Sequence, residues 1–332
     1  MKTIFLKNIL TKALPLCLAL SLFCACAQQA VPSDVRVAVI KGTSSIGMIK
    51  LIDEVESGEI DTNNFTFEIF ASPDEVVPKV VRGDVNIAAV PPNLAAVLYN
   101  TTDGAVRAVA LGTLGMLYVV EKGDTIKSVE DLRGKTIYAG FKGKSPEYDL
   151  NYILKANGME PEKDVNIEWK SEHSETVAAL VTSEDGVAIL PQPFVTTALM
   201  ANADVKIALD LNEEWGKTQE RADIPSTLIT TVVVARADFI EQNPEAVNDF
   251  FTRYAASVAF VNGNVDEAAV LVEKHDIFPA DVAREAIPLC NIIYIDGAEM
   301  KEKLSGYLNI LFEQNPQSVG GSLPGEEFYF VK

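Results

Sequence analysis

The sequence is poor in histidine, the side chain that enzymes use most often for proton transfer and for metal binding. Its 332 residues include two histidines. His173 and His275 stand among charged residues, in the segments "KSEHSE" and "VEKHDI", so we expect both at the surface. The glycines do not follow the spacing of a phosphate-binding loop. The sequence therefore predicts no catalytic residue, no metal and no cofactor.

Basic residues are also scarce. The chain has 47 acidic and 28 basic residues, which gives a formal net charge of −19. Because nucleic-acid binding requires a concentrated basic surface, we expect no nucleic-acid partner. The net charge says little about a small ligand, since a pocket can differ in sign from the surface around it. The length suits about two folded domains.

Three of the four cysteines lie in the first 26 residues, and this segment differs from the rest of the chain. Three lysines (Lys2, Lys7 and Lys12) precede the apolar run "ALPLCLALSLFCACA", which is too short for a membrane span. This layout predicts a signal peptide over residues 1–26, and therefore export. Loss of its three lysines would change the net charge to 25 − 47 = −22.

The leader ends at a cysteine, as bacterial lipoprotein signals do. Ala25 is the small residue expected before a lipidated cysteine, so we predict lipidation of Cys26. Cys24 is the poorer candidate because it follows Phe23. The alternative is an ordinary signal peptide that is cut near Ala27. An acyl chain would anchor the protein to a membrane surface without spanning it.

Cys290 is the only cysteine outside the leader, so no intramolecular disulfide is expected. It lies in "AIPLCNIIYI", where we predict a small buried hydrophobic side chain. Stability then has to come from the apolar core.

Strand-like segments alternate with helical patterns over much of the chain. Residues 35–40, 65–70 and 85–90 have the β-rich apolar composition of strands. Helical patterns separate them, and Ser72 is placed to cap the second of these helices. This alternation is typical of parallel strands that are joined by crossover helices.

The alternation begins again at residue 128 and continues to residue 211, and the chain is mainly helical from residue 237. We therefore predict an α/β fold with two lobes, each a mainly parallel sheet flanked by helices. The predicted boundaries are 27–115 and 230–332 for lobe 1, and 116–229 for lobe 2. Two strand-like segments, 114–123 and 226–236, cross between the lobes.

Two stretches share one pattern: "RGDVNIAAVPPNLAAVLY" (82–99) and "SEDGVAILPQPFVTTALM" (183–200). In each, a short apolar strand ends at a proline, Pro91 or Pro191, and a helix follows at once. Ligands of open parallel sheets bind beyond the carboxyl ends of the strands, and proline suits the first turn of a helix. If the lobes face each other, both proline-ended strands line one cleft.

The pieces "GDVNIAAVPPNLAAVLYN", "SVEDLRGKTI", "GVAILPQPFVTTAL" and "NPEAVNDFFTRYAASVAFVNGNVDEA" give the chain a resemblance to a known family. It resembles the periplasmic-binding-protein superfamily, in the branch of nitrate, taurine and sulfonate solute-binding lipoproteins of ABC importers. The resemblance implies a type II two-lobed fold, closure of the lobes on a ligand, and delivery to a membrane permease with its ATPase. Relatives often have Pro-Glu-Pro where this chain has Pro191-Gln192-Pro193, which argues against a cation held by a carboxylate there.

The candidate ligand contacts lie in the turns that follow the strands. Hydroxyls and free helix N–H groups at Thr43, Ser44, Ser45 and Ser145 suit a polar oxygen or an anion, although each could simply cap its helix. Asn93 has the same two interpretations, and Lys144 could add charge or be solvated. The aromatic residues best placed to stack on a flat ligand are Tyr118, Tyr138, Phe141 and Trp215, with core packing as the alternative. The complete predicted set is Thr43, Ser44, Ser45, Pro92, Asn93, Thr113, Tyr118, Gly140, Lys144, Ser145, Gln192 and Pro193.

The sequence thus predicts a monomeric, extracytoplasmic solute-binding component of an ABC import system that captures a small polar or anionic solute. Hydroxyl-rich turns favour an oxyanion, whereas the aromatic residues leave a heterocyclic precursor open. One alternative is an enzyme on the same scaffold, in pyrimidine or menaquinone biosynthesis, although such a cytosolic enzyme would not need the leader. A sensory receptor for a solute is the other alternative.

Overall fold

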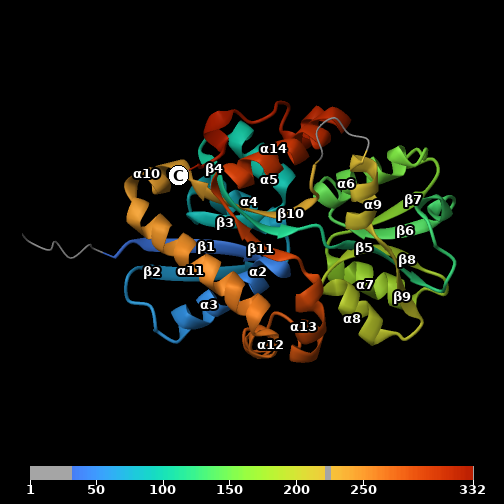
Figure 1. Ribbon diagram of the computed structural model, residues 1–332, viewed down its shortest axis with the longest axis horizontal. Coiled ribbons are helices and arrows are strands. Elements are labelled where there is room, and N and C mark those ends of the chain that lie inside the picture. The colour runs from blue at the N-terminus through green and yellow to red at the C-terminus, as the bar shows by residue number, and fades with distance from the viewer. Residues whose placement is uncertain (1–31, 221–225, 332) are drawn as a thin grey trace, which may run out of the picture. The chain divides into compact units, whose positions relative to one another are not determined.

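Two β-sheets flanked by helices make up the part of the chain that the computed structural model describes, residues 32–220 and 226–331 (Figure 1). The predicted leader and Cys26 lie outside the described residues. Residues Ser33–Lys332 belong to one compact unit. We call the first sheet with its helices lobe 1, and the second sheet with its helices lobe 2.

The sheet of lobe 1 has six strands in the order β11-β4-β10-β3-β1-β2. Strand β1 pairs in parallel with β2 and β3, whereas β10 is antiparallel to both β3 and β4, and β11 is antiparallel to β4. The bounds of these strands are β1 (Asp34–Ile40), β2 (Asn64–Phe70), β3 (Ile87–Val90), β4 (Val106–Leu114), β10 (Ile229–Arg236) and β11 (Ile292–Ile295).

The sheet of lobe 2 repeats this plan with five strands in the order β7-β6-β8-β5-β9. Strand β6 is parallel to β7 and β8, and β5 is antiparallel to β8 and β9. The bounds are β5 (Leu117–Lys122), β6 (Thr136–Gly140), β7 (Asn166–Lys170), β8 (Val187–Pro191) and β9 (Val205–Asp210). Strands β3 and β8, which carry the two proline-ended stretches, therefore occupy equivalent positions.

The two-lobed α/β fold is confirmed, and the expectation of mainly parallel sheets needs one correction. Each sheet has a parallel part and an antiparallel part of similar size. The two predicted crossing segments explain this: 114–123 enters the second sheet as β5, and 226–236 enters the first as β10. Each arrives from the other lobe, so it runs opposite to the parallel strand beside it.

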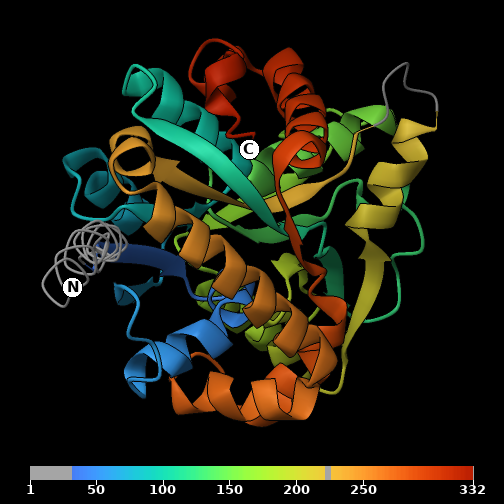
Figure 2. The same cartoon turned by 60° about the vertical axis from the view of Figure 1, so that its left-hand side comes forward.

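Helices cover both faces of the sheets. In Figures 1 and 2, α11 runs across one face of the first sheet, where α3, α12 and α13 share its apolar core. On the other face, α4, α5 and α14 belong to a core that continues into α6 and α9 of lobe 2. Trp215 of α9 is fully buried there, with its ring centroid 5.7 Å from that of Tyr307 of α14. Of the two interpretations for Trp215, the structure selects core packing.

The helix bounds follow the chain order. Lobe 1 contains α2 (Thr43–Gly47), α3 (Ile49–Glu56), α4 (Pro73–Arg82), α5 (Pro92–Thr101), α10 (Ala237–Gln242), α11 (Pro244–Gly263), α12 (Val265–Lys274), α13 (Ala280–Ala286) and α14 (Gly297–Gln314). Lobe 2 contains α6 (Ser145–Ala156), α7 (His173–Thr182), α8 (Phe194–Ala201) and α9 (Leu211–Gln219). No helix in these described ranges is both long and apolar enough to cross a membrane.

Local signals in the sequence set several of these ends. Ser72 caps α4, as predicted: its Oγ accepts from the N–H of Asp74 at 3.2 Å, and Glu75 accepts from the N–H of Ser72 at 3.1 Å. This reciprocal pair satisfies two N–H groups that the first turn leaves free. Cys290 is completely buried, also as predicted, and burial raises the pKa of its thiol.

His275 lies inside the protein, and its predicted surface position is wrong. Its side chain is 4% exposed, and Nε2 lies 3.0 Å from Oδ1 of Asp53 on α3. The prediction failed because the imidazole turns toward Asp53 of α3, as does the side chain of its neighbour Lys274.

The hydroxyl of Ser257 on α11 binds the backbone where α2 ends and α3 begins. Residues of α2 also line a cavity between the lobes. The Ser257 Oγ donates to the carbonyl of Gly47 at 2.9 Å and accepts from the N–H of Leu51 at 3.4 Å. Both backbone groups belong to the interruption in the helical ladder, and the contact is buried. One hydroxyl of α11 therefore holds the junction of α2 and α3 in place from about 200 positions further along the chain.

We expect Ser257→Ala to lower the free energy of unfolding by about 1–3 kcal/mol, because two buried backbone groups lose their partner. Chemical denaturation of the variant measures this change. The matched control is Ser305→Ala on α14, whose hydroxyl makes an exposed bond to the carbonyl of Glu302 and whose loss should cost under about 0.5 kcal/mol. Equal stabilities for the two variants would contradict the assigned role of Ser257.

Candidate functional site

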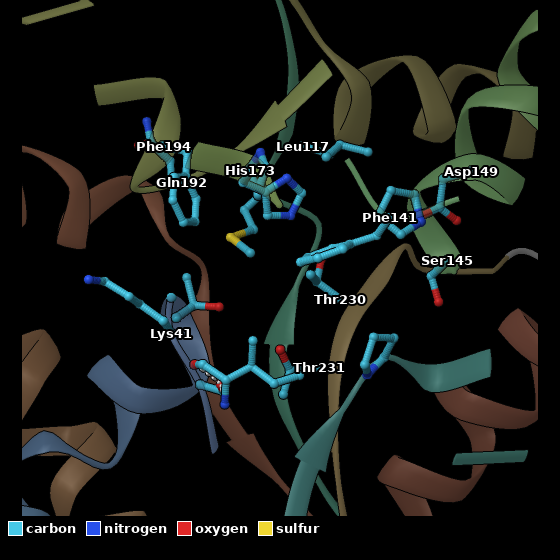
Figure 3. Close-up of a pocket in the computed structure, with 18 residues that line it drawn as sticks. Lys41, Leu117, Phe141, Ser145, Asp149, His173, Gln192, Phe194, Thr230 and Thr231 are labelled. Atoms are coloured by element: carbon cyan, nitrogen blue, oxygen red, sulfur yellow. Dashed lines mark hydrogen bonds between the residues drawn. The ribbon is translucent and has the colours of Figure 1, made fainter. Parts of the chain in front are cut away.

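A cavity of about 80 Å³ lies between the lobes and is lined by residues of both (Figure 3). Pro91, at the end of β3, and Pro191, at the end of β8, both line it. The prediction that the two proline-ended strands meet at one cleft is confirmed. Each strand is the last parallel one beside an antiparallel crossing strand, and open sheets bind ligands where their strand order changes direction.

Equivalent turns of the two lobes form most of the cavity wall. The turn from β1 to α2 supplies Thr43 and Ser44, and the corresponding turn from β6 to α6 supplies Phe141 and Ser145. Phe141 has a φ of 63°, a backbone conformation that residues with a side chain seldom adopt. Figure 3 shows Gln192, His173 and Phe194 on one side of the cavity and Lys41 and Thr231 on the opposite side.

A row of aromatic rings continues from this cavity into a larger one of about 410 Å³, to which it is adjacent. The ring centroids of Phe141 and His173 are 4.5 Å apart, and those of His173 and Phe194 are 5.2 Å apart. Phe194 in turn lies 5.2 Å from Phe278 of lobe 1. The first three rings line both cavities, so the row forms a shared apolar wall.

The hydroxyls of the first turn are engaged within the protein. Ser44 Oγ donates to the carbonyl of Ile40 at 2.7 Å, and Ser45 Oγ donates to that of Gly42 at 2.9 Å. Thr113 Oγ1 donates to Thr43 Oγ1 at 3.2 Å. These bonds brace the turn, while Thr43 and Ser44 still face the cavity.

Asn93 and Ser145 join the two lobes directly. The Asn93 Oδ1 accepts from both the N–H and the hydroxyl of Ser145, each at 3.1 Å. The Asn93 Nδ2 donates to the carbonyls of Gly143 at 3.2 Å and Ser318 at 3.4 Å. Both residues are almost fully buried. Asn93 therefore caps the first turn of α6 across the gap between the lobes.

A second contact between lobes has an ionisable group. The hydroxyl of Tyr307 on α14 donates to Oδ1 of Asp149 on α6 at 2.6 Å. Asp149 is buried and lines the cavity. Burial raises the pKa of its carboxyl to about 8, although the Tyr307 hydrogen bond opposes that shift. A third contact, the ion pair between Lys144 and Asp74, has an N–O distance of 2.7 Å.

His173 lines the cavity, and its predicted surface position is also wrong. It is the first residue of α7, and its ring lines the cavity. Burial lowers the pKa of its imidazole to about 3, so the ring is neutral. Its buried Nδ1 has no hydrogen-bond partner. A Cβ at Gly140 would lie 2.7 Å from this nitrogen, so the ring packs where only glycine leaves room.

Gln192 has one end of its amide engaged and the other free. Its Oε1 accepts from the N–H of Thr196 at 3.3 Å and from the Thr196 hydroxyl at 2.9 Å. Its Nε2 is buried without a partner. The side chain is 1% exposed and lines the cavity.

The structure brings four of the twelve predicted contacts to the cavity wall: Thr43, Ser44, Ser145 and Gln192. The other eight stand behind or beside it, namely Ser45, Pro92, Asn93, Thr113, Tyr118, Gly140, Lys144 and Pro193. Tyr118 is buried in β5, and burial raises the pKa of its hydroxyl to about 12. The sequence did not single out Lys41, Asp149, Phe194, Thr230 or Thr231, although an aspartate among the apolar residues of a helix was a usable signal for Asp149.

Metal-ligating side chains do not cluster in the described part of the chain. Within residues 32–220 and 226–331, no group of three or more His, Cys, Asp and Glu side chains could hold a metal. No hydrogen bond links His173 to a serine, threonine or cysteine in the same ranges. The arrangement is suited to holding a small molecule between two lobes.

A family model matches most of this chain. The model for "ABC transporter, phosphonate, periplasmic substrate-binding protein" matches residues 51–275. No curated protein is matched by sequence.

Several solved structures share the fold. An ABC transporter protein from Parabacteroides distasonis has a TM-score of 0.73 at 24% identity, over 90% of this chain and 99% of that one. The periplasmic aliphatic sulphonate binding protein SsuA from Escherichia coli has a TM-score of 0.70 at 16% identity, over 88% and 96%. The periplasmic nitrate-binding protein NrtA from Synechocystis PCC 6803 has a TM-score of 0.60 at 15% identity, over 76% and 69%.

The pKa of Asp149 predicts how stability depends on pH. An unfolded aspartate titrates near pH 4, whereas burial raises the folded pKa of Asp149 to about 8. Between these values the folded state binds the extra proton, so the free energy of unfolding falls as pH rises. We expect Asp149→Asn to remove this decline, because the amide is neutral throughout and keeps an oxygen for Tyr307.

Thermal unfolding from pH 4 to pH 9 measures the effect. Asp185→Asn is the matched control, since Asp185 is an exposed carboxyl of the same lobe, and its profile should follow the unmodified protein. Parallel profiles for the unmodified protein and Asp149→Asn would show that Asp149 does not titrate in this window.

Proposed function

The chain belongs to the phosphonate-type family of periplasmic substrate-binding proteins of ABC transporters, and from this premise we propose what it binds and how. It captures a small polar or anionic solute in the cavity between its lobes and delivers the solute to a membrane permease with its ATPase. The observation that supports this most is the cavity lined by equivalent turns of both lobes. We further propose that it acts as a monomer and catalyses no reaction.

Binding would work through closure of the lobes. A solute that contacts both lobes stabilises the closed form only by its differential affinity for that form. The contacts of Asn93 with Ser145, of Tyr307 with Asp149 and of Lys144 with Asp74 would add to the closed form. The permease would then recognise the closed arrangement.

The hinge would lie where the chain crosses between sheets. One crossing is the short stretch between β4 and β5, at Gly115 and Met116. A Cβ at Gly115 would lie 2.3 Å from the side-chain oxygen of Asn212, so this close passage requires glycine. Both crossings lie at the lobe boundaries proposed from the sequence, which are 27–115 with 230–332 for lobe 1 and 116–229 for lobe 2.

The family places the protein outside the cytoplasm, and the finer location is our proposal. Residues 1–26 would direct export, and an acyl chain on Cys26 would hold the protein at the outer face of the membrane. The enzyme alternative is not favoured, because the family and the similar structures are transport proteins.

We expect one solute class to raise the melting temperature of purified residues 27–332 in a thermal-shift screen. Binding to the folded state alone stabilises it by about 2.7 kcal/mol when the solute is at 100 times its Kd. Sulfonates, nitrate, aminopyrimidines and amino acids form the first panel. If no member stabilises the protein and one is chemically converted, the protein is an enzyme and the proposed transport role is wrong.

We expect Cys26→Ala to release the exported protein from the membrane fraction, because no acyl chain can then be attached. Partition of the full chain between detergent and aqueous phases measures anchoring. Cys24→Ala is the matched control and should leave the protein in the detergent phase. Anchoring that survives Cys26→Ala, or loss of anchoring in Cys24→Ala alone, would contradict the assignment of the lipid to Cys26.

A further inference from the structure

Two buried polar atoms at the cavity have no hydrogen-bond partner: Gln192 Nε2 and His173 Nδ1. The direction of the Gln192 amide follows from its neighbour, since the N–H of Thr196 can donate only to the amide oxygen. The free end is therefore the NH₂ group. A buried donor without a partner costs free energy, and an acceptor on a bound molecule would remove that cost.

At the starts of α5, α6 and α8, one N–H group each is already occupied. The Asn93 N–H at the start of α5 donates to Ser145 Oγ at 3.5 Å, and the Ser145 N–H at the start of α6 donates to Asn93 Oδ1 at 3.1 Å. At the start of α8, the Thr196 N–H donates to Gln192 Oε1. One N–H group at each of these three helix starts is thus satisfied by the protein's own oxygen atoms, which reduces the attraction of these starts for an anion.

The cavity also lacks an interior positive charge. Lys41 is the only lysine that lines it, and no arginine does. Lys41 is exposed at the edge, with Nζ 3.4 Å from the carbonyl of Asp276 and 5.6 Å from the ring centroid of Phe278. An anion buried here would lack a close counter-charge, and such burial is costly.

A cation would find no better partner. Asp149 is the only carboxyl among the lining residues, and burial keeps it protonated at neutral pH. It already accepts a hydrogen bond from Tyr307. His173 is neutral, because burial lowers its pKa to about 3.

The remaining wall is mostly apolar, although Thr230 and Thr231 also line it. Phe141, His173 and Phe194 present rings, and Met116 and Leu117 add aliphatic surface. Rings of this kind stack on planar molecules and gain little from a compact tetrahedral ion. Apolar walls with a few directed polar groups are typical of sites for small organic ligands.

We propose that the cavity binds an uncharged, flat heterocyclic solute whose carbonyl or ring nitrogen accepts a hydrogen bond from Gln192, and not an oxyanion. This inference rests on the proposed function, since it names the solute class of the same site. The aromatic wall holds the faces of the ring, and Gln192 fixes its orientation in the plane.

Calorimetric titration of the exported, purified protein at pH 7 tests the proposal with three sets of probes. The uncharged flat set is uracil, cytosine and nicotinamide; the anions are nitrate, methanesulfonate and methylphosphonate; the cation is protonated 4-aminopyridine. We expect at least one uncharged probe to bind with a Kd below about 1 mM, and every charged probe to bind at least tenfold more weakly.

The variant Gln192→Leu removes the donor and keeps a similar volume. It should weaken the best uncharged probe by about tenfold, because one directed hydrogen bond is lost. Gln317→Leu is the matched control, since Gln317 is exposed on the surface of lobe 1, and it should leave the Kd unchanged. Melting curves of both variants check that they are folded.

The outcomes separate this inference from the proposed function. If an anion or the cation binds more tightly than every uncharged probe, the solute class is wrong and the solute-binding function stands. Unchanged binding in a folded Gln192→Leu variant overturns the role of Gln192. If no probe of any set binds, both the solute class and the solute-binding function fail.

Discussion

Polar groups buried between the two lobes must find partners, and this requirement organises the region around the cavity. Asn93 finds its partner in the other lobe, since its amide oxygen accepts hydrogen bonds from Ser145 at the start of α6. Asp149 meets the requirement by retaining a proton and accepting from Tyr307. Gln192 is only partly satisfied: its amide oxygen accepts a hydrogen bond from Thr196, and its amide nitrogen has no partner. The unpaired Nε2 of Gln192 is the group that would orient a bound solute in the cavity.

The two lobes are joined by different kinds of contact on their two sides, and this difference lets a stable fold contain a site between lobes. On one face, the apolar core continues from α14 into α9, where Tyr307 and Trp215 pack together. On the cavity side, the contacts between lobes include a few hydrogen bonds, the ion pair of Lys144 with Asp74 and the ring contact of Phe194 with Phe278. Polar contacts of this kind exchange with water at little net cost, which would allow the proposed closure to respond to a bound solute.

The charge of the whole chain and the charge of the cavity are independent. The whole chain carries a formal net charge of −19, while the lining residues include one lysine at the edge and one buried carboxyl. The similar structures include binding proteins for sulphonate and nitrate. Shared fold does not fix the solute, because the solute meets the few side chains of the cavity and the fold only positions them.

The sequence by itself determined the two-lobed α/β plan, the capped start of α4 and the meeting of Pro91 with Pro191 at one cavity. These features follow from periodicity, capping and turn chemistry, which act over a few neighbouring residues. The tertiary structure alone decided that His173 lies inside and that Asn93 binds Ser145. That hydrogen bond joins residues 52 positions apart, and only the packing of the lobes decides which polar atoms are satisfied and which are left for a ligand.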